Sequence, residues 1–295
     1  MDMIEIEHLT KDYGGGRGVF DVSFTVKKGE VLGFLGPNGA GKTTTIRHLM
    51  GFVRPEQGRL SIQGMDCFKD AAKIQQKLGY LPGEIAFMED MTGTQFLKFI
   101  GRMKGVREFK RRDELIERFE LNPEGRIKKM SKGMKQKIGI ICAFMQQPDI
   151  LILDEPTSGL DPLMQNLFVE LIQEEKEKGT TILMSSHMFE EVERTCDRTA
   201  IIKEGHLAAV EDMAALKGSR YKTYRVAFKD AGMAESFEAE GAKIKERENN
   251  RVTVKIKGDI MPFIKALGRY EVTGLDVVEQ TLEDLFMHYY GGKGE

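Results

Sequence analysis

Cysteine is scarce in this sequence, which has three in 295 residues. Cys67, Cys142 and Cys196 stand far apart, so no pair has the spacing of a zinc or redox motif. An odd number of isolated cysteines also argues against a disulfide framework. The composition therefore favours a protein from a reducing cytosol.

Long apolar runs and an excess of one charge are also missing. The longest apolar run, around residues 138–144, is far shorter than the roughly 18 residues that a membrane-spanning helix needs, so we expect a buried helix there. The first residues, MDMIEIEHLT, lack the basic and apolar regions of a signal peptide. The formal net charge of -2 gives no reason to expect a nucleic-acid partner. Any membrane role is therefore expected to act through a partner protein.

Short apolar strands alternate with helical segments over the first two-thirds of the chain. Residues 31–35 and 150–153 are apolar runs of the buried-strand type, and residues 162–178 have a helical composition. Between 87 and 144 the spacing is helical, and Phe96, Phe99, Ile100 and Met103 fall on one helix face. This alternation predicts an α/β fold with a mostly parallel sheet.

The pattern changes after about residue 215. Tyr224, Val226 and Phe228 alternate with polar residues, as do Val252, Val254 and Ile256, and both runs predict strands. Thr281 followed by Asp284 predicts a helix start. We therefore expect a main domain at 1–215 and a small α+β domain at 220–295.

A phosphate-binding loop is the strongest local signal. Residues 36–43 read GPNGAGKT, which fits the pattern G-x-x-x-x-G-K-[ST] between a strand and a helix. Its glycines allow backbone N–H groups to point at an anion beside a helix N-terminus, while Lys42 reaches the phosphates and Thr43 ligates Mg²⁺. The residues expected to bind ATP here are Gly36, Pro37, Asn38, Gly39, Ala40, Gly41, Lys42, Thr43 and Thr44.

Two carboxylates end the apolar strand ILILDEP at 150–156. Ligands of α/β sheets bind at the carboxyl ends of the strands. Asp154 is thus placed to hold Mg²⁺, and Glu155 to orient or deprotonate the attacking water. Together with Lys42, these residues predict binding and hydrolysis of MgATP.

Four further segments occur in the order of a known family. MSKGMKQK at 130–137 resembles a signature motif, SGLD at 158–161 resembles a D-loop, and His187 in ILMSSH resembles a switch histidine. Tyr13 resembles the aromatic residue that stacks on adenine, although it also suits a half-buried strand. The chain resembles the nucleotide-binding subunit of an ATP-binding cassette (ABC) transporter. The resemblance implies a P-loop NTPase cassette with a mixed sheet core, an antiparallel β subdomain and a helical signature subdomain at about 85–147.

The resemblance also implies roles for these residues. His187 would polarise the γ-phosphate and hold the attacking water, so the expected catalytic residues are Lys42, Glu155 and His187. The signature would act on the ATP of a partner chain, because a Ser131 hydroxyl and a Gly133 N–H can both contact a γ-phosphate. The expected signature residues are Ser131, Lys132, Gly133 and Met134, and the expected D-loop residues are Ser158, Gly159, Leu160 and Asp161.

One position departs from the family pattern. A glutamine usually follows the strand that corresponds to residues 78–82, where this sequence has Gly83 and then Glu84. Two alternatives follow: Glu84 substitutes as an oxygen ligand of Mg²⁺, or the loop lacks that contact.

At the level of function, the resemblance implies the ATPase subunit of an exporter. Such a subunit pairs with itself or with a homologue and sits peripherally on the cytoplasmic face of the membrane, below separate permease subunits. The sequence TLEDLF at 281–286 resembles the end of an accessory domain found in exporters of drugs, peptides and lipids. The alternative is a non-transport ABC ATPase that serves translation or DNA, but the second cassette or long coiled-coil insertion of those proteins is not seen here.

Overall fold

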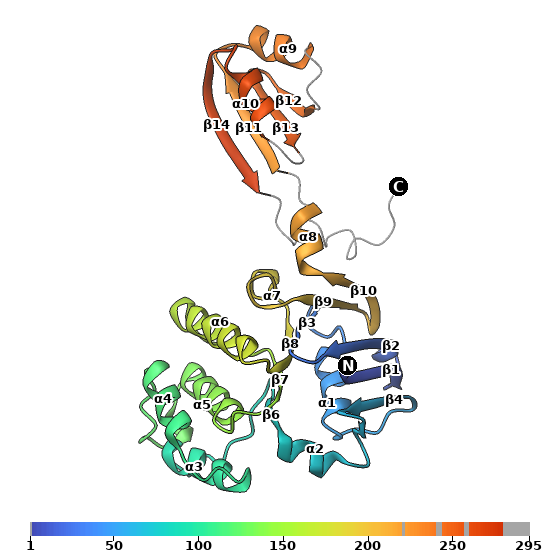
Figure 1. The fold of residues 1–295 in the computed structure, drawn as a ribbon, viewed down its shortest axis with the longest axis vertical. Helices are drawn as coiled ribbons and strands as arrows, with labels where there is room; N and C mark the ends of the chain where they lie inside the picture. Colours follow the sequence, from blue (N-terminus) through green and yellow to red (C-terminus); the bar gives the residue numbers. More distant parts are fainter. Residues whose placement is uncertain (1, 220–221, 240–243, 257–259, 280–295) are drawn as a thin grey trace. The chain divides into compact units, whose positions relative to one another are not determined.

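The computed structural model describes residues 2–219, 222–239, 244–256 and 260–279. The chain divides into two compact units, Met1–Met213 and Ala214–Glu295 (Figure 1). Within the described ranges, no helix is both long and apolar enough to cross a membrane.

A six-stranded sheet forms the centre of the first unit, in the order β10-β9-β3-β8-β7-β6 (Figure 1). Neighbouring strands from β9 to β6 are parallel, and β10 pairs antiparallel with β9. Every residue of β3, β7 and β8 is buried, which explains their unbroken apolar sequence and confirms the α/β prediction. The strands are β3 (Val31–Leu35), β6 (Leu78–Leu81), β7 (Ile150–Asp154), β8 (Thr181–Ser186), β9 (Arg198–Lys203) and β10 (His206–Asp212).

An antiparallel sheet in the order β2-β1-β4-β5 shares its hydrophobic core with the first sheet. The rings of Phe24 in β2 and Phe34 in β3 lie 5.0 Å apart. Ile46 and Leu49 of helix α1 are buried in the same core, so the helix that follows the phosphate loop is anchored along one face. The elements are β1 (Asp2–Asp12), β2 (Gly18–Lys27), β4 (Gln57–Ile62), β5 (Met65–Asp66) and α1 (Lys42–Leu49).

A helical part lies between β6 and β7 in the sequence. It consists of α3 (Gly93–Met103), α4 (Lys110–Arg118), the 3-10 helix η1 (Ile127–Lys129) and α5 (Lys132–Phe144). Thr92 starts α3 with a capping box in which it exchanges two hydrogen bonds with Gln95. Phe96 is 6% exposed, whereas Met103 in the last turn of α3 is 68% exposed. The predicted apolar face of this helix is therefore buried at its start and exposed to solvent at its end.

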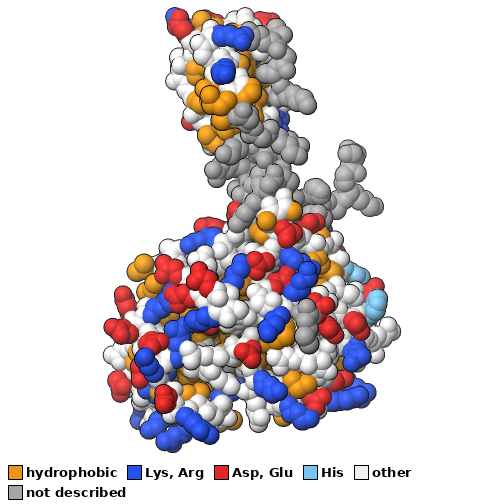
Figure 2. All heavy atoms as spheres, in the orientation of Figure 1, with side chains coloured by type: hydrophobic (Ala, Val, Ile, Leu, Met, Phe, Trp, Pro, Cys, Tyr) orange, Lys and Arg blue, Asp and Glu red, His pale blue; other side chains and the backbone are white. Residues whose placement is uncertain are grey.

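The other helices of the first unit are α2 (Ala71–Lys77), α6 (Pro162–Glu177) and α7 (Phe189–Thr195). The helical prediction for 162–178 is confirmed by α6, where Asp161 caps the N-terminus by accepting a hydrogen bond from Met164 N at 3.0 Å. Acidic and basic side chains are interspersed on the visible face of this unit (Figure 2).

The second unit contains an antiparallel sheet in the order β12-β13-β11-β14, with helices α9 and α10 packed on it. Tyr224, Val226 and Phe228 are buried against Phe237 of α9 and Phe263 of α10, which confirms the alternation in the sequence. The elements are α8 (Met213–Ser219), β11 (Lys222–Phe228), α9 (Ala231–Ala239), β12 (Ile244–Glu248), β13 (Arg251–Ile256), α10 (Met261–Leu267) and β14 (Val272–Glu279). The TLEDLF segment and the expected helix start at Thr281 lie outside the described residues.

Candidate active site

Three loops with the predicted chemistry meet at one edge of the parallel sheet. The phosphate loop follows β3, Glu155 follows β7, and His187 follows β8. These strands are neighbours in the order β3-β8-β7, with Leu35 opposite Ser186 and Asp154 opposite Ser185 (Figure 1). Because the strands are parallel and in this register, their carboxyl ends bring the three loops together.

The phosphate loop has backbone positions that only glycine fits. A Cβ on Gly36 would lie 2.4 Å from the carbonyl oxygen of Ile202. Gly41 has a φ of 112°, and a Cβ there would lie 2.7 Å from Cγ1 of Val19. The loop is therefore held close to β9 and β2, in a shape that other residues would strain.

Lys42 begins α1 and is only 5% exposed. Its Nζ donates hydrogen bonds to the carbonyl oxygens of Gly36 at 2.6 Å and Pro37 at 3.2 Å. The side chain thus folds back over the loop and keeps its charge at the place where a phosphate would bind. The remaining loop residues divide into exposed Pro37, Asn38, Gly39 and Thr43, half-buried Gly41 and Thr44, and buried Ala40.

Asp154 is completely buried at the end of β7. Its Oδ1 accepts a hydrogen bond from the Ser185 hydroxyl at 2.5 Å, while Oδ2 has no hydrogen-bond partner among the described residues. A Cβ on Gly83 would lie 3.1 Å from this free oxygen. Gly83 thus lets the backbone of its loop approach Asp154, and Glu84 is exposed next to it.

Glu155 contacts both the phosphate loop and the loop that carries His187. Its Oε2 lies 2.6 Å from Nδ1 of His187, and its Oε1 lies 3.1 Å from Nζ of Lys42. The backbone at Glu155 has a φ of 49°, which is unusual for a residue other than glycine. Its N–H points at both the carbonyl oxygen and the hydroxyl of Ser185, at 3.2 and 3.1 Å. Neighbouring contacts therefore hold a strained residue at the centre of the site.

A cavity of about 540 Å³ opens beside these groups. Its lining residues come from the phosphate loop, the Gly83 loop, α5 and the loops after β7 and β8. They are Asn38, Thr43, Gly83, Glu84, Ile85, Phe87, Lys132, Lys135, Gln136, Glu155, Ser158 and His187. The predicted Mg²⁺ ligand Thr43 and the predicted catalytic residues Glu155 and His187 thus face one space.

The donors at this edge fit Mg²⁺. Hard oxygen ligands suit this ion, which keeps several waters and also binds substrate phosphates. Asp154 Oδ2 is a buried carboxylate oxygen without a partner in the described chain, and the exposed Thr43 hydroxyl faces the cavity. Within the described ranges, no group of three or more His, Cys, Asp or Glu side chains could hold a metal ion.

The signature residues lie against the D-loop of the same chain. Ser131 caps α5 by accepting a hydrogen bond from Met134 N at 3.2 Å, and both Ser131 and Lys132 are exposed. Nζ of Lys132 donates to the Ser158 hydroxyl at 3.1 Å, and a Cβ on Gly133 would lie 2.9 Å from the Gly159 carbonyl oxygen. The two motifs are therefore packed as one surface. Leu160 is buried beneath it, and Asp161 caps α6.

Tyr13 lies in the loop between β1 and β2 and is 54% exposed. Nζ of Lys11 lies 5.6 Å from the centre of its ring. Gly18, which ends this loop, has its carbonyl oxygen 3.4 Å from the Cβ position of Gly41. The loop thus ends beside the phosphate loop, and the ring of Tyr13 is exposed, with Lys11 over it. Tyr13 does not line the cavity that holds Glu155.

Three polar residues that support the site belong to none of the sequence motifs. Nε2 of buried Gln136 in α5 donates to the Pro156 carbonyl oxygen at 2.7 Å and steadies the segment after Glu155. Ser185 holds Asp154 and Glu155, and Ser186 holds the loop of His187. The available signal was a pair of serines at the end of an apolar strand, directly before the histidine.

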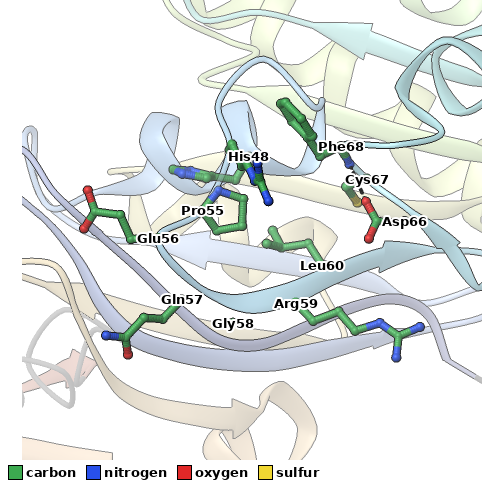
Figure 3. A pocket seen from close by; sticks show the side chains of 11 residues that line it. His48, Pro55, Glu56, Gln57, Gly58, Arg59, Leu60, Asp66, Cys67 and Phe68 are labelled. Carbon is green, nitrogen blue, oxygen red and sulfur yellow. Dashed lines mark hydrogen bonds between the residues drawn. The ribbon is translucent and has the colours of Figure 1, made fainter.

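A second cavity, of about 290 Å³, lies between the end of α1 and the β4–β5 region (Figure 3). His48 lines it and is 1% exposed, with Nδ1 2.8 Å from the Thr44 carbonyl oxygen. Because a carbonyl only accepts, Nδ1 carries the proton, and Nε2 is left without a partner in the described ranges. Burial lowers the pKa of His48. The described residues that line this second cavity include none of the predicted nucleotide-binding or catalytic residues. Nucleotide chemistry is therefore assigned to the first cavity.

Comparisons with known proteins agree with this geometry. Residues 19–158 match a family model described as ABC transporter. The chain is 40% identical over 213 residues to the linearmycin resistance ATP-binding protein LnrL of Bacillus subtilis (strain 168), covering 70% of this chain and 68% of that protein. It is 33% identical over 302 residues to the bacitracin transport ATP-binding protein BcrA of Bacillus licheniformis, covering 98% of both.

Among solved structures, an ATP binding subunit of an ABC transporter matches with a TM-score of 0.67 and 33% identity. The match covers 73% of this chain and 92% of that chain. The part matched by the family model includes both the phosphate loop and the Asp154–Glu155 pair.

Proposed function

The chain belongs to the ABC transporter family as an ATP-binding, ATP-hydrolysing subunit, and on that premise we propose that it powers an exporter of drugs, peptides or lipids. The observation that carries the site assignment is the bridge from Lys42 through Glu155 to His187. It lies beside Oδ2 of Asp154, which has no hydrogen-bond partner among the described residues. A nucleotide-binding fold without catalysis would have no need of this arrangement.

In the proposed reaction, the phosphate loop binds ATP through its backbone N–H groups and Lys42. A γ-phosphate that binds the Lys42 ammonium group would replace the ion pair between Lys42 and Oε1 of Glu155. This carboxylate oxygen is then free to orient water and to accept its proton. His187 is held through Nδ1 at Oε2 of the same carboxylate, and its other ring nitrogen is proposed to hold the attacking water beside the γ-phosphate. Tyr13 stacks on the adenine ring.

Asp154 and Thr43 are the residues that would hold Mg²⁺ at this site. When bound, the ion supplies positive charge that neutralises the phosphate oxygens. The Ser185 hydroxyl fixes one oxygen of Asp154, so the other is held in place beside Gly83. Gly83 provides the close backbone approach at Asp154, and Glu84 stands at the rim of the cavity.

We propose that the working form is a dimer, either of two copies or with a homologous chain. The support is the exposed surface formed by Ser131, Lys132 and the Gly133–Gly159 contact, which offers a hydroxyl and a helix N-terminus to an anion. ATP bound to one chain would be covered by this surface of the other. ATP binding then favours the closed pair, and hydrolysis favours its opening.

Separate membrane-spanning subunits are the second proposed partner, and the chain is placed with them on the cytoplasmic face of the membrane. Exposed apolar side chains support such docking. They are Met88 and Met103, which lie between β6 and β7 in the sequence, and Phe52, whose ring contacts Tyr80 of β6. The names of two relatives refer to linearmycin resistance and bacitracin transport, which supports export of drug-like or peptide cargo. The second compact unit is proposed to be an accessory domain, at about 220–295.

Affinity-tagged chain purified from detergent-solubilised membranes of its own host tests this assignment. We expect stoichiometric recovery of a membrane protein with several apolar helices, together with MgATP hydrolysis. Recovery of ribosomes, nucleic acid or a DNA-bound complex in place of that protein would favour the non-transport alternative.

A further inference from the structure

Glu191 is a buried carboxylate near the active site that belongs to none of the recognised motifs. It lies in α7, four residues after His187, and is 6% exposed. Its Oε2 accepts a hydrogen bond from the Ser186 hydroxyl at 2.5 Å, and the Ser186 oxygen accepts one from Met188 N at 2.9 Å. Through Ser186, Glu191 therefore holds the backbone on both sides of His187.

The same carboxyl group also meets the segment that follows Glu155. The Thr157 hydroxyl interacts with it and favours its charged form. Oε1 finds no hydrogen-bond partner within the part of the chain that the structure describes. A cavity of about 50 Å³ lies against Glu191 and Thr157, which is room for one water molecule. Glu191 thus stands between the loop of His187 and the segment from Glu155 to the D-loop.

We propose that Glu191 is a positioning residue for ATP hydrolysis, which fixes the Ser186–Met188 turn, and hence His187, against the segment that carries Glu155 and Thr157. The proposal rests on the role assigned to His187 above. Glu191 does not touch the reacting atoms and acts through Ser186.

The charge on Glu191 changes near neutral pH. Burial raises the pKa of its carboxyl group to about 7, against the hydrogen bond from Ser186 and the interaction with Thr157, which lower it. The titratable or charged groups that influence it or border the same cavity are Glu155, His187, Glu190, Arg194 and Cys196. Ionised Glu191 accepts a charge-assisted hydrogen bond from Ser186, which is stronger than the bond to the neutral acid. The turn is therefore held more firmly above pH 7 than below it.

The test compares ATP turnover of the full chain with that of Glu191→Gln from pH 6 to pH 8. Glutamine keeps the shape and the acceptor oxygen but stays neutral, so it imitates the protonated acid. We expect the ratio of wild-type to variant kcat to rise from near one at pH 6 to roughly five- to tenfold at pH 8, with KM for ATP unchanged.

Melting temperatures over pH 5 to 8 give a readout that does not depend on activity. A raised pKa means that the folded state loses stability as pH rises from the ordinary glutamate range to about 7. The neutral variant escapes this loss, so its melting temperature should gain on the wild type through that window and then level off. Ser186→Ala, which removes the hydroxyl held by Glu191, should show the same pH-dependent kcat deficit and carries the test where Glu191→Gln does not fold.

Glu190→Gln is the matched control, because Glu190 is an exposed neighbour on the same helix and borders the same cavity. Its kcat ratio should stay near one at every pH. A constant ratio for Glu191→Gln from pH 6 to 8, or an equal effect in the control, overturns the proposal. If His187→Ala keeps wild-type turnover, the role of His187 itself is wrong. An impaired His187→Ala with an unaffected Glu191→Gln removes the role of Glu191 alone.

Discussion

Lys42 and Glu155 form an ion pair across the active site, with Nζ 3.1 Å from Oε1, although they lie on different loops of the sheet edge. Lys42 is also held by two carbonyl oxygens, and Glu155 is also held by His187. A phosphate that binds Lys42 must compete with the Glu155 carboxylate. Nucleotide binding and release of Glu155, the proposed general base, would thereby be linked through one contact.

Glu155→Gln is expected to separate nucleotide binding from hydrolysis. Glutamine keeps the size of the side chain and its contact with His187, but it cannot accept the proton from water. Turnover should fall by ~10²–10⁴-fold, the usual contribution of a general base. ATP affinity should be kept or improved, because the competing carboxylate charge is gone. Single-turnover hydrolysis and titration with a fluorescent ATP analogue measure the two effects.

The same variant should accumulate as an ATP-bound dimer. Light scattering after size-exclusion chromatography with MgATP should give twice the mass found without nucleotide. Normal turnover in Glu155→Gln would remove this residue from the chemical step.

Gly83→Ala tests the loop that lacks the usual glutamine. A Cβ there would lie 3.1 Å from Oδ2 of Asp154, so either the loop or the carboxylate must shift by a few tenths of an ångström. We expect a severalfold rise in the Mg²⁺ concentration that gives half-maximal turnover. Glu84→Ala in the same titration distinguishes the two alternatives: a change comparable to that of Gly83→Ala supports Glu84 as a ligand. An unchanged curve makes Glu84 a solvated residue of the cavity rim.

Mixed dimers test whether each active site is built from two chains. Lys42→Ala disables its own phosphate loop, and Ser131→Arg blocks the signature surface that it would lend to a partner. In a mixed pair, one site combines both defects, while the other has an intact loop and an intact signature. Mixing the two inactive variants should therefore restore some hydrolysis in a single-turnover assay. Cross-linking establishes that mixed pairs form, and their failure to hydrolyse ATP would place the complete site within one chain. If the native partner is a homologue, the same test uses that pair.

His48→Asn should change how stability depends on acid. Burial lowers the pKa of His48 below its ordinary value, so the unfolded chain takes up a proton at a higher pH than the folded chain does. Stability due to neutral His48 is present above about pH 6.5 and is lost as pH falls through the lower pKa of the folded state. Asparagine can still donate to the Thr44 carbonyl oxygen but does not titrate. Melting temperatures from pH 7.5 to 5 should move in favour of the variant, and a pH-independent difference contradicts the account.

Much of the site could be predicted from contiguous residues. The loop at 36–43, the carboxylates at the end of β7 and the histidine after β8 are all where the sequence indicated. Gly83 departs from the family pattern in the sequence, but only the folded chain puts its backbone against Asp154 and gives the departure a structural reason. The roles of Gln136, Ser185 and Glu191 could not be predicted, because their hydrogen-bond partners lie on other elements. A buried polar residue has no local signature until its hydrogen-bond partner is known.

The phosphate loop was determined by sequence alone, because eight consecutive residues specify its backbone angles and the helix that starts at Lys42. Apolar runs and alternation likewise determined which segments become buried or half-buried strands. Only the tertiary structure decided that Lys42 and His187 both contact the carboxylate of Glu155. Their contact depends on the order and register of β3, β8 and β7, which are pairings between distant segments and leave no mark in any local pattern. The same pairing places buried Glu191 behind His187, where desolvation raises its pKa toward neutrality.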